Sequence, residues 1–404
     1  GLVCMAPSLP ALAEFRLVPY VAGAIEFDNN LPRLPNDAAA VARRGEPHRE
    51  DTITRYTLGF DSFYAIGLQK FKLVGLVNRT EHNRYTELDF NGHQVSGTWE
   101  WGIGSRLGGN LTVVDERALE NFANRIDDST ERSFVDSTTV AFDTSYRLFG
   151  NMELRPAVNT RRTRHTLPSS QRQDLDEETA RFGVSYVPSP KGDIGVEVAL
   201  TQGEFVQRQP AAGLVEEYDQ LTTQAVGTWK PSPVTSLTFS LGFSQRDNQG
   251  LEVGNDSGLV GKLNLTRQIS AKTSAYVGAY RNLSSSDLQG ESTVETTGWD
   301  AGASWTPTAK LKLDASYFLQ KEVYEDSTLF LPPGAEPLPE NPDRAPSRRS
   351  DDVQSATLSL NYTPIEWLII GPYYRWQDRS SELQSQDYHA YQVGIEARFQ
   401  YEVW

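Results

Sequence analysis

Charged side chains at alternate positions of strand-like segments are the residues of this sequence that could act on a solute. If the other face of these segments contacts lipid, the charged side chains line the water-filled interior of a barrel, where charges of mixed sign set the preference for ions and solutes. Tyr373 and Phe318 would add aromatic rings that either stack on sugar rings or pack against the wall. The candidate lumen residues are Arg155, Arg161, Arg181, Arg375, Arg398, Glu100, Glu396, Lys312, Asp314 and Tyr373.

Three of these arginines are expected to form one basic stripe. Arg155 and Arg161 share one face of a predicted strand, Arg181 belongs to the next, and the run 161–164 continues toward the outer mouth. One interpretation is a ladder for an anionic sugar polymer or another anion. The alternative is that the arginines pair with carboxylates such as Glu153 and Asp143, because lumen charges are usually neutralised in pairs.

Catalytic and metal chemistry find little support. No motif places a nucleophile beside a base, and the histidines show no metal-ligand spacing, so we expect no enzyme, no metal and no cofactor. The only cysteine is Cys4, which excludes disulfides and a cysteine metal site. An excess of 53 acidic over 38 basic residues argues against a general nucleic-acid partner. The histidines are His48, His82, His93, His165 and His389.

The segment at the end of the chain shows which elements must position the charges. Between 391 and 403, Val393, Ile395 and Phe399 alternate with Glu396 and Arg398. Because strand side chains alternate with a period of two, this segment is a strand with one apolar and one polar face.

The same pattern recurs and predicts about eighteen antiparallel strands in an all-β, up-and-down transmembrane barrel. Short turns and longer polar connections alternate between the strands, which is typical of tight periplasmic turns and long extracellular loops. The predicted strands are 15–28, 53–66, 71–82, 92–104, 109–117, 134–148, 151–163, 177–187, 193–205, 218–230, 235–246, 258–268, 272–282, 293–306, 309–322, 350–362, 366–378 and 387–403.

An outer-membrane location follows from this pattern. The chain has no run of roughly 18 apolar residues, and its mean hydropathy is −0.49, but a barrel strand needs only one apolar face. An even strand number allows closure with both termini in the periplasm. Tryptophans near strand ends, for example Trp99, Trp229 and Trp367, are expected in the interfacial girdles. Trp404 is out of phase with the apolar face.

Residues 1–13 are expected to be a signal-peptide remnant that ends in Ala11-Leu12-Ala13, a small-x-small cleavage pattern. Residues 14–404 then form a single barrel without a plug domain. A proline-rich connection, 331–349, either folds inward as a constriction or covers the mouth.

Several segments resemble the EpsL family of outer-membrane barrels associated with exopolysaccharide biosynthesis. The similarity lies in 69–73, 85–92 and 97–101, followed by the turn at Gly108-Gly109. Further similar segments are Phe27 to Asn30, Tyr373 to Arg375, Arg379 to Ser381, and Asp387-Tyr388.

This resemblance implies a passive conduit that exports an exopolysaccharide, with the polymer, outer-membrane lipid and periplasmic polysaccharide-export proteins as partners. Two alternatives stay open because architecture does not fix function. One is a general or solute-selective diffusion porin. The other is a barrel plugged by its loops that serves as an envelope scaffold.

Overall fold

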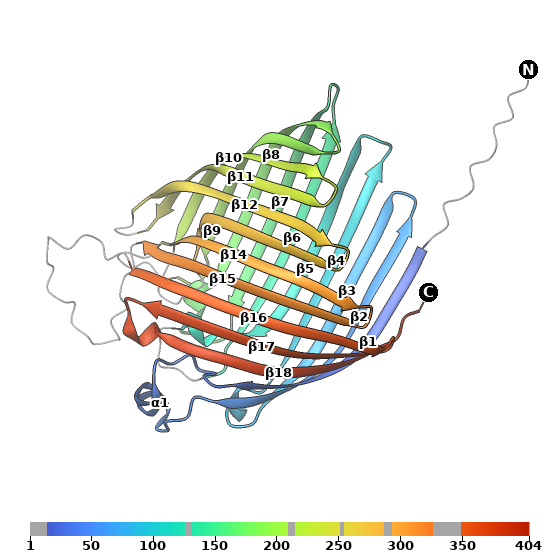
Figure 1. The fold of residues 1–404 in the computed structure, drawn as a ribbon. Coiled ribbons are helices and arrows are strands. Elements are labelled where there is room, and N and C mark those ends of the chain that lie inside the picture. Colours follow the sequence, from blue (N-terminus) through green and yellow to red (C-terminus); the bar gives the residue numbers. More distant parts are fainter. Residues whose placement is uncertain are drawn as a thin grey trace, which may run out of the picture.

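The computed structural model describes residues 14–125, 131–208, 215–250, 254–286, 293–325 and 349–403. The expected signal-peptide remnant, Trp404 and nearly all of the proline-rich connection lie outside these residues. The predicted architecture is confirmed: eighteen antiparallel strands form one closed sheet (Figure 1).

Each strand pairs with its neighbours in sequence, and the last pairs with the first. The strands are β1 (Glu14–Asp28), β2 (Asp51–Ile66), β3 (Gln69–His82), β4 (Phe90–Ile103), β5 (Leu107–Leu119), β6 (Phe134–Arg147), β7 (Met152–His165), β8 (Leu175–Ser189), β9 (Gly192–Phe205), β10 (Glu217–Ser232), β11 (Thr235–Gln249), β12 (Asp256–Ser270), β13 (Thr273–Ser285), β14 (Thr293–Thr308), β15 (Leu311–Glu325), β16 (Arg349–Ile365), β17 (Leu368–Ser381) and β18 (Tyr388–Gln400).

Closure occurs between β1 and β18. Their ladder runs from Tyr20 opposite Gln400 to Asp28 opposite Gln392, and an isolated bridge joins Leu17 to Val403. No edge is therefore left in the sheet, which is the condition for placing a sheet in lipid, where free backbone groups find no water.

The connections at the two ends of the barrel differ in length, as predicted. The start of β1 and the end of β18 lie at the end that carries the short turns (Figure 1). The opposite end carries the long connections, with helix α1 (Asp37–Arg44) and the 3-10 turns η1 (Thr86–Leu88), η2 (Phe122–Asn124), η3 (Gln171–Gln173) and η4 (Gln384–Gln386). We call the first end periplasmic and the second external, following the usual orientation of such barrels.

The outward face is apolar along the middle of the strands. Leu241, Leu259 and Ile395 are among the exposed large hydrophobic residues. At the periplasmic end, neighbouring strands stack the rings of Tyr64, Phe71 and Trp99 into part of an aromatic girdle. An apolar belt bounded by aromatic rings on a closed barrel identifies an integral outer-membrane protein.

Two details differ from the sequence-based expectations. Many strands extend one to three residues further than predicted at one or both ends, because ladder pairing continues into the polar segments that border the apolar belt, whereas the last strand ends at Gln400 and not at 403. Helix α1 lies in a segment expected to be a loop; Asn36 caps its start through Ala39 N, and Gly45 ends it in a left-handed conformation. Within the described residues, no helix is long and apolar enough to cross a membrane.

Candidate functional site

The ladder register determines which side chains face the lumen. Residues directly opposite one another point to the same face of a sheet. Asp143 is opposite Ala157, which is opposite Arg181, and Arg155 lies two positions from Ala157 on the same face. Alternation from such rows places all ten candidate lumen residues on the inward face, opposite to the exposed apolar residues. Their role in contacting a solute stays a prediction.

The arginines of the expected basic stripe are paired with carboxylates. Arg155 contacts Glu153 and Asp193, each at 2.8 Å. Arg181 contacts Asp143 at 2.7 Å and reaches Glu197 at 3.7 Å. The structure therefore has the paired arrangement that the sequence left open as the alternative to a free ladder.

Arg161 stands apart from these pairs. It lies opposite Thr139 and Glu177, and no carboxylate among the described residues lies within 4.0 Å of its guanidinium. The rest of the run does not continue the stripe, because Arg162 and Arg164 alternate to the outward face. A one-residue step along a strand reverses the face, so four consecutive residues cannot line one lumen.

Ion pairs also involve other candidates. Lys312 contacts Asp314 at 2.9 Å, and Glu100 accepts a hydrogen bond from Lys70 at 3.1 Å. Arg375 donates to the amide oxygen of Gln392 at 3.3 Å. These partners lie on the same strand or a neighbouring strand. The charges of Lys312 and Glu100 are therefore neutralised along the wall, whereas Arg375 is bound by a neutral amide.

Tyr373 lies flat against the wall. A side chain at Gly394, directly opposite on β18, would overlap its ring, and its hydroxyl donates a hydrogen bond to Glu26 on β1. Glu396, two residues further along β18, lies opposite Ala24 and Gly371. The Tyr373 ring therefore lies over a glycine and does not project into the lumen.

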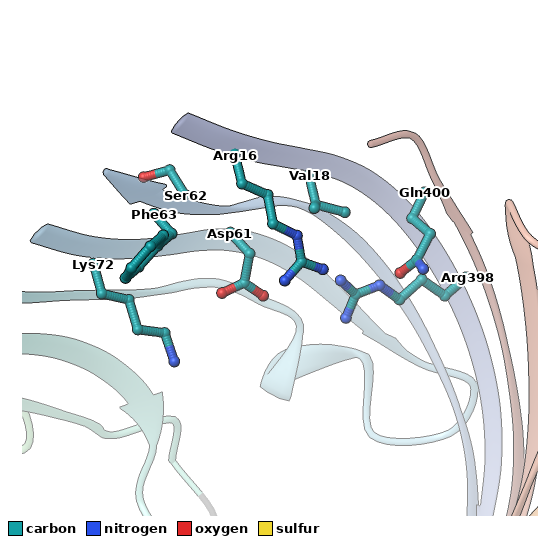
Figure 2. Close-up of a pocket in the computed structure, with 8 residues that line it drawn as sticks. All are labelled: Arg16, Val18, Asp61, Ser62, Phe63, Lys72, Arg398 and Gln400. Carbon is teal, nitrogen blue, oxygen red and sulfur yellow. The ribbon is translucent and has the colours of Figure 1, made fainter. Parts of the chain in front are cut away.

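A basic group at the periplasmic end of the lumen, which we call the basal cluster, consists of Arg16, Lys72 and Arg398. Figure 2 shows the three side chains turned toward a common space, with Asp61 beside them. They line a cavity of about 380 Å³. Arg16 is paired with Glu402, whereas no carboxylate among the described residues lies within 4.0 Å of Lys72 or Arg398.

Arg398 is held by stacking. Its guanidinium carbon lies 3.7 Å from the centroid of the Tyr20 ring, an arrangement that favours the cation. Its Nε is buried without a hydrogen-bond partner in the described structure. The guanidinium is therefore positioned by the ring.

The described part of the connection between β5 and β6, residues 120–125 and 131–133, reaches across the external mouth, and we call it the crossing loop. The carbonyl oxygen of Ala123 accepts a hydrogen bond from Arg379 on β17 at 2.9 Å, and that of Arg125 accepts one from Gln386 at 2.9 Å. Ala123 also packs with Tyr388 and Ala390 of β18. Four strands and β18 separate these elements along the wall, so the contact passes through the interior of the barrel.

A buried charge network supports this contact. Arg379 also donates to the carboxylate of Asp351 and to the hydroxyl of Tyr324, the latter at 3.0 Å. Asp351 is fully buried and also accepts from Arg349 and Ser381. Because a guanidinium presents five donors in a fixed plane, one side chain binds the carboxylate and the loop carbonyl together.

The other end of the crossing loop is attached to neighbouring loops. Glu120 accepts from Arg125 at 3.2 Å and from Ser170, before η3, at 2.9 Å. Arg132 donates to the carbonyl of Asp89 in the connection that contains η1, at 2.6 Å. The crossing loop is thus held at several points and narrows the mouth by its position.

Arg208, beyond the end of β9, binds the turn η3 through hydrogen bonds. It donates to the carbonyls of Arg172 and Val215 at 3.1 and 2.8 Å. Burial, together with the nearby cations Arg246 and Arg172, lowers the pKa of Arg208 to about 9. The side chain therefore remains protonated at neutral pH.

Sequence reasoning missed Arg379, Asp351 and two members of the basal cluster, Arg16 and Lys72, whereas Arg398 was among the candidate lumen residues. Arg379 fell into a predicted loop, and nothing in the sequence indicates its contact with a carbonyl 256 residues away. The basal cluster was detectable in principle, since Arg16 and Lys72 alternate with apolar residues within predicted strands. Among the described residues, no group of three or more histidine, cysteine or carboxylate side chains could hold a metal.

Comparisons with known proteins give similar solved structures but no family and no curated relative. No protein-family model and no curated protein matches the chain. The outer-membrane protein OpdK of Pseudomonas aeruginosa is similar, with a TM-score of 0.46, 11% identity, and coverage of 96% of this chain and 99% of that one. OccK2 (OpdF) of the same organism, solved with glucuronate, has a TM-score of 0.47 and 12% identity, and the similarity covers 96% of this chain and 98% of that one. OccK5 (OpdH) has a TM-score of 0.45 and 9% identity, and the similarity covers 97% of this chain and 99% of that one.

Replacing Arg379 by lysine is expected to release the crossing loop. Lysine keeps the charge near Asp351, but its single ammonium cannot also hold the Ala123 carbonyl in the same geometry. Single-channel recordings in planar bilayers should show a larger mean conductance and more switching between levels. The control is Arg375→Lys on the same strand, which should behave as the wild type. Equal traces for R379K and wild type would show that Arg379 does not fix the loop; heat-modifiable gel mobility checks folding.

Removing two charges of the basal cluster, Lys72→Gln with Arg398→Gln, is expected to shift selectivity toward cations. Lumen charges concentrate counter-ions, whereas charges on the outer surface are remote from the permeation path. The measurement is the reversal potential across a KCl gradient. The control Arg162→Gln with Arg267→Gln removes the same charge from outward-facing positions. An equal shift in both double variants would refute a role specific to the cluster.

Proposed function

We propose that this protein is a water-filled outer-membrane pore for the passive diffusion of small polar solutes. The observation that carries the proposal is the way the inward charges pair. The pairs Lys70–Glu100, Arg181–Asp143 and Lys312–Asp314 follow the wall and do not bridge the lumen. A wall of hydrated groups on an eighteen-strand barrel is suited to an aqueous channel.

The crossing loop supplies size selection in this proposal. It is bound to the inner face of β17 and β18, so solutes must pass beside it. The basal cluster adds a positively charged contact at the periplasmic mouth. Transport is driven only by the concentration gradient of the solute.

The proposal predicts swelling of liposomes that contain the purified, folded protein when they are diluted into an isotonic sugar solution. Arabinose should enter quickly and the tetrasaccharide stachyose more slowly, because the crossing loop restricts the mouth. Liposomes without protein and liposomes with heat-denatured protein serve as controls. Swelling no faster than in these controls, for every sugar tested, would rule out a diffusion pore and favour a barrel plugged by its loops.

A second candidate is the passive export of an exopolysaccharide, which the resemblance to the EpsL family implies. One structural observation favours it. The wall from β12 to β16 carries many uncharged hydroxyl groups, which suit a polyhydroxylated polymer; they line one cavity of about 270 Å³ and include Thr266, Ser274, Tyr276, Ser304, Ser316, Thr357 and Ser359. Periplasmic polysaccharide-export proteins would be its partners.

The two candidates predict different results on deletion of the gene. If the barrel exports polymer, the polysaccharide should disappear from the surface and medium and accumulate in the periplasm, and the wild-type gene should restore it. If the barrel is a diffusion pore, the distribution of polymer should not change, while uptake of small solutes slows. Quantifying polymer in the three fractions distinguishes the two.

A further inference from the structure

The ladder between β12 and β13 is shorter than the strands that form it. It runs from Gly261 opposite Arg281 to the periplasmic turn. Beyond this point, Asp256 to Val260 pair only with β11, and Asn282 to Ser285 pair only with β14. The two strands therefore separate at the external end.

The free end of β13 bends toward the inner face of the wall. The carbonyl of Leu283 accepts a hydrogen bond from Gln220 of β10 at 3.4 Å. The hydroxyl of Ser285 donates to that of Tyr218 at 3.0 Å and accepts from Arg246 of β11 at 3.4 Å. Tyr218 and Arg246 are almost fully buried, and the guanidinium of Arg246 stacks on the Tyr218 ring at 3.4 Å. These contacts hold the end of β13 over β10 and β11, inside the barrel.

This bend forms a cavity of about 470 Å³ between the displaced strand and the wall. We call it the β13 pocket. Its volume is within the range of small-molecule sites, roughly 300–1,000 Å³. Its side chains come from β10 to β13 and are mostly polar: Gln220, Thr222, Gln224, Ser240, Lys262, Tyr280, Arg281 and Asn282.

The charges of the β13 pocket favour an anion. Its lining contains no carboxylate, and within the described structure none lies within 4.0 Å of the Lys262 ammonium, which is exposed to the lumen. The carboxylates of the neighbouring strands are otherwise engaged or displaced: Glu295 pairs with Arg281 at 2.8 Å, and Glu197 accepts from Gln224 at 2.9 Å. The carboxylate of Asp300 on β14 lies over Gly278 of β13, in the space that a side chain at this glycine would occupy.

The neutral groups favour a ligand with several hydroxyls. Lys262 lies directly between Ser240 and Tyr280 in one cross-strand row. The Tyr280 hydroxyl is turned toward β15, where it donates to Gln320 at 2.8 Å, so the Ser240 hydroxyl is the one directly beside Lys262 in this row. The amides of Gln220 and Asn282 bound the same space. Amides and hydroxyls both donate and accept, which matches the alternating donors and acceptors of a polyol.

We propose that the β13 pocket is a binding site for small polyhydroxylated monoanions, in which Lys262 contacts the carboxylate and the amides and hydroxyls contact the polyol chain. The proposal refines the diffusion pore described above, on which it rests, by naming a class of solute that the pore retains. A charge-assisted hydrogen bond from an ammonium is about twice as strong as a neutral one, so Lys262 should dominate discrimination between an acid and its neutral analogue.

The test uses gluconate and sorbitol as probes, because both are six-carbon polyols and only gluconate carries a carboxylate. Saturation-transfer NMR on the folded, detergent-solubilised full-length protein measures the two dissociation constants. Gluconate should bind about tenfold more tightly than sorbitol, a difference that corresponds to about 1.4 kcal/mol. Lys262→Gln should remove this preference. Lys230→Gln, at the periplasmic end of β10 and outside the β13 pocket, should retain it.

Three results would overturn the site. They are equal binding of gluconate and sorbitol, unchanged gluconate binding in K262Q, and an equal loss in K262Q and K230Q, which would indicate a general lumen charge effect. Liposome swelling decides the pore separately. If the protein binds gluconate through Lys262 but liposomes that contain it do not swell, the diffusion pore is refuted and the binding site is supported. If the liposomes swell but binding does not depend on Lys262, the pore is supported and the site is refuted.

Discussion

Every backbone polar group within a membrane must find a partner inside the protein, and the rest of this structure depends on that constraint. The ladder between β1 and β18 satisfies this constraint, because it closes the sheet and gives the backbone groups of both strands a partner. Closure makes every strand internal, so each strand can expose an apolar face to lipid without leaving an edge. The strict alternation of Val393, Ile395 and Phe399 with Glu396 and Arg398 follows from this geometry.

Closure also creates an inner face that is free of contact with lipid. Charged residues are costly in hydrocarbon, but inside the barrel they remain hydrated and meet partners two residues or one or two strands away. Arg155 and Arg181 illustrate the result, since each contacts two carboxylates along the wall. A polar interior organised in this way supports an open lumen better than it supports a packed core.

The regular barrel is interrupted at its external end, and two of the candidate functional features, the crossing loop and the β13 pocket, lie there or near it. The crossing loop is bound by Arg379 to the far wall, and β13 leaves its ladder with β12 to enclose a polar cavity. Both departures are held by buried arginines, Arg379 and Arg246, whose planar guanidinium groups make several directed bonds. Irregular backbone is tolerated in these places because it lies inside the protein or above the apolar belt.

The sequence by itself determined the strand number, the alternation of short turns and long connections, and the face on which each candidate lumen residue lies. These features are local, because a period of two and the position of turn residues can be read along the chain. Helix α1 was missed since a short helix within a polar segment has no apolar stripe of sufficient length.

The tertiary structure decided which charges neutralise each other and which remain available. Arg155 and Arg161 look alike in sequence, yet one contacts two carboxylates and the other has none within 4.0 Å among the described residues. Likewise, only the folded chain brings Arg379 to Ala123 and shows that β13 turns inward. Such contacts join residues far apart in the chain, and their geometry depends on where the barrel closes and how its loops pack.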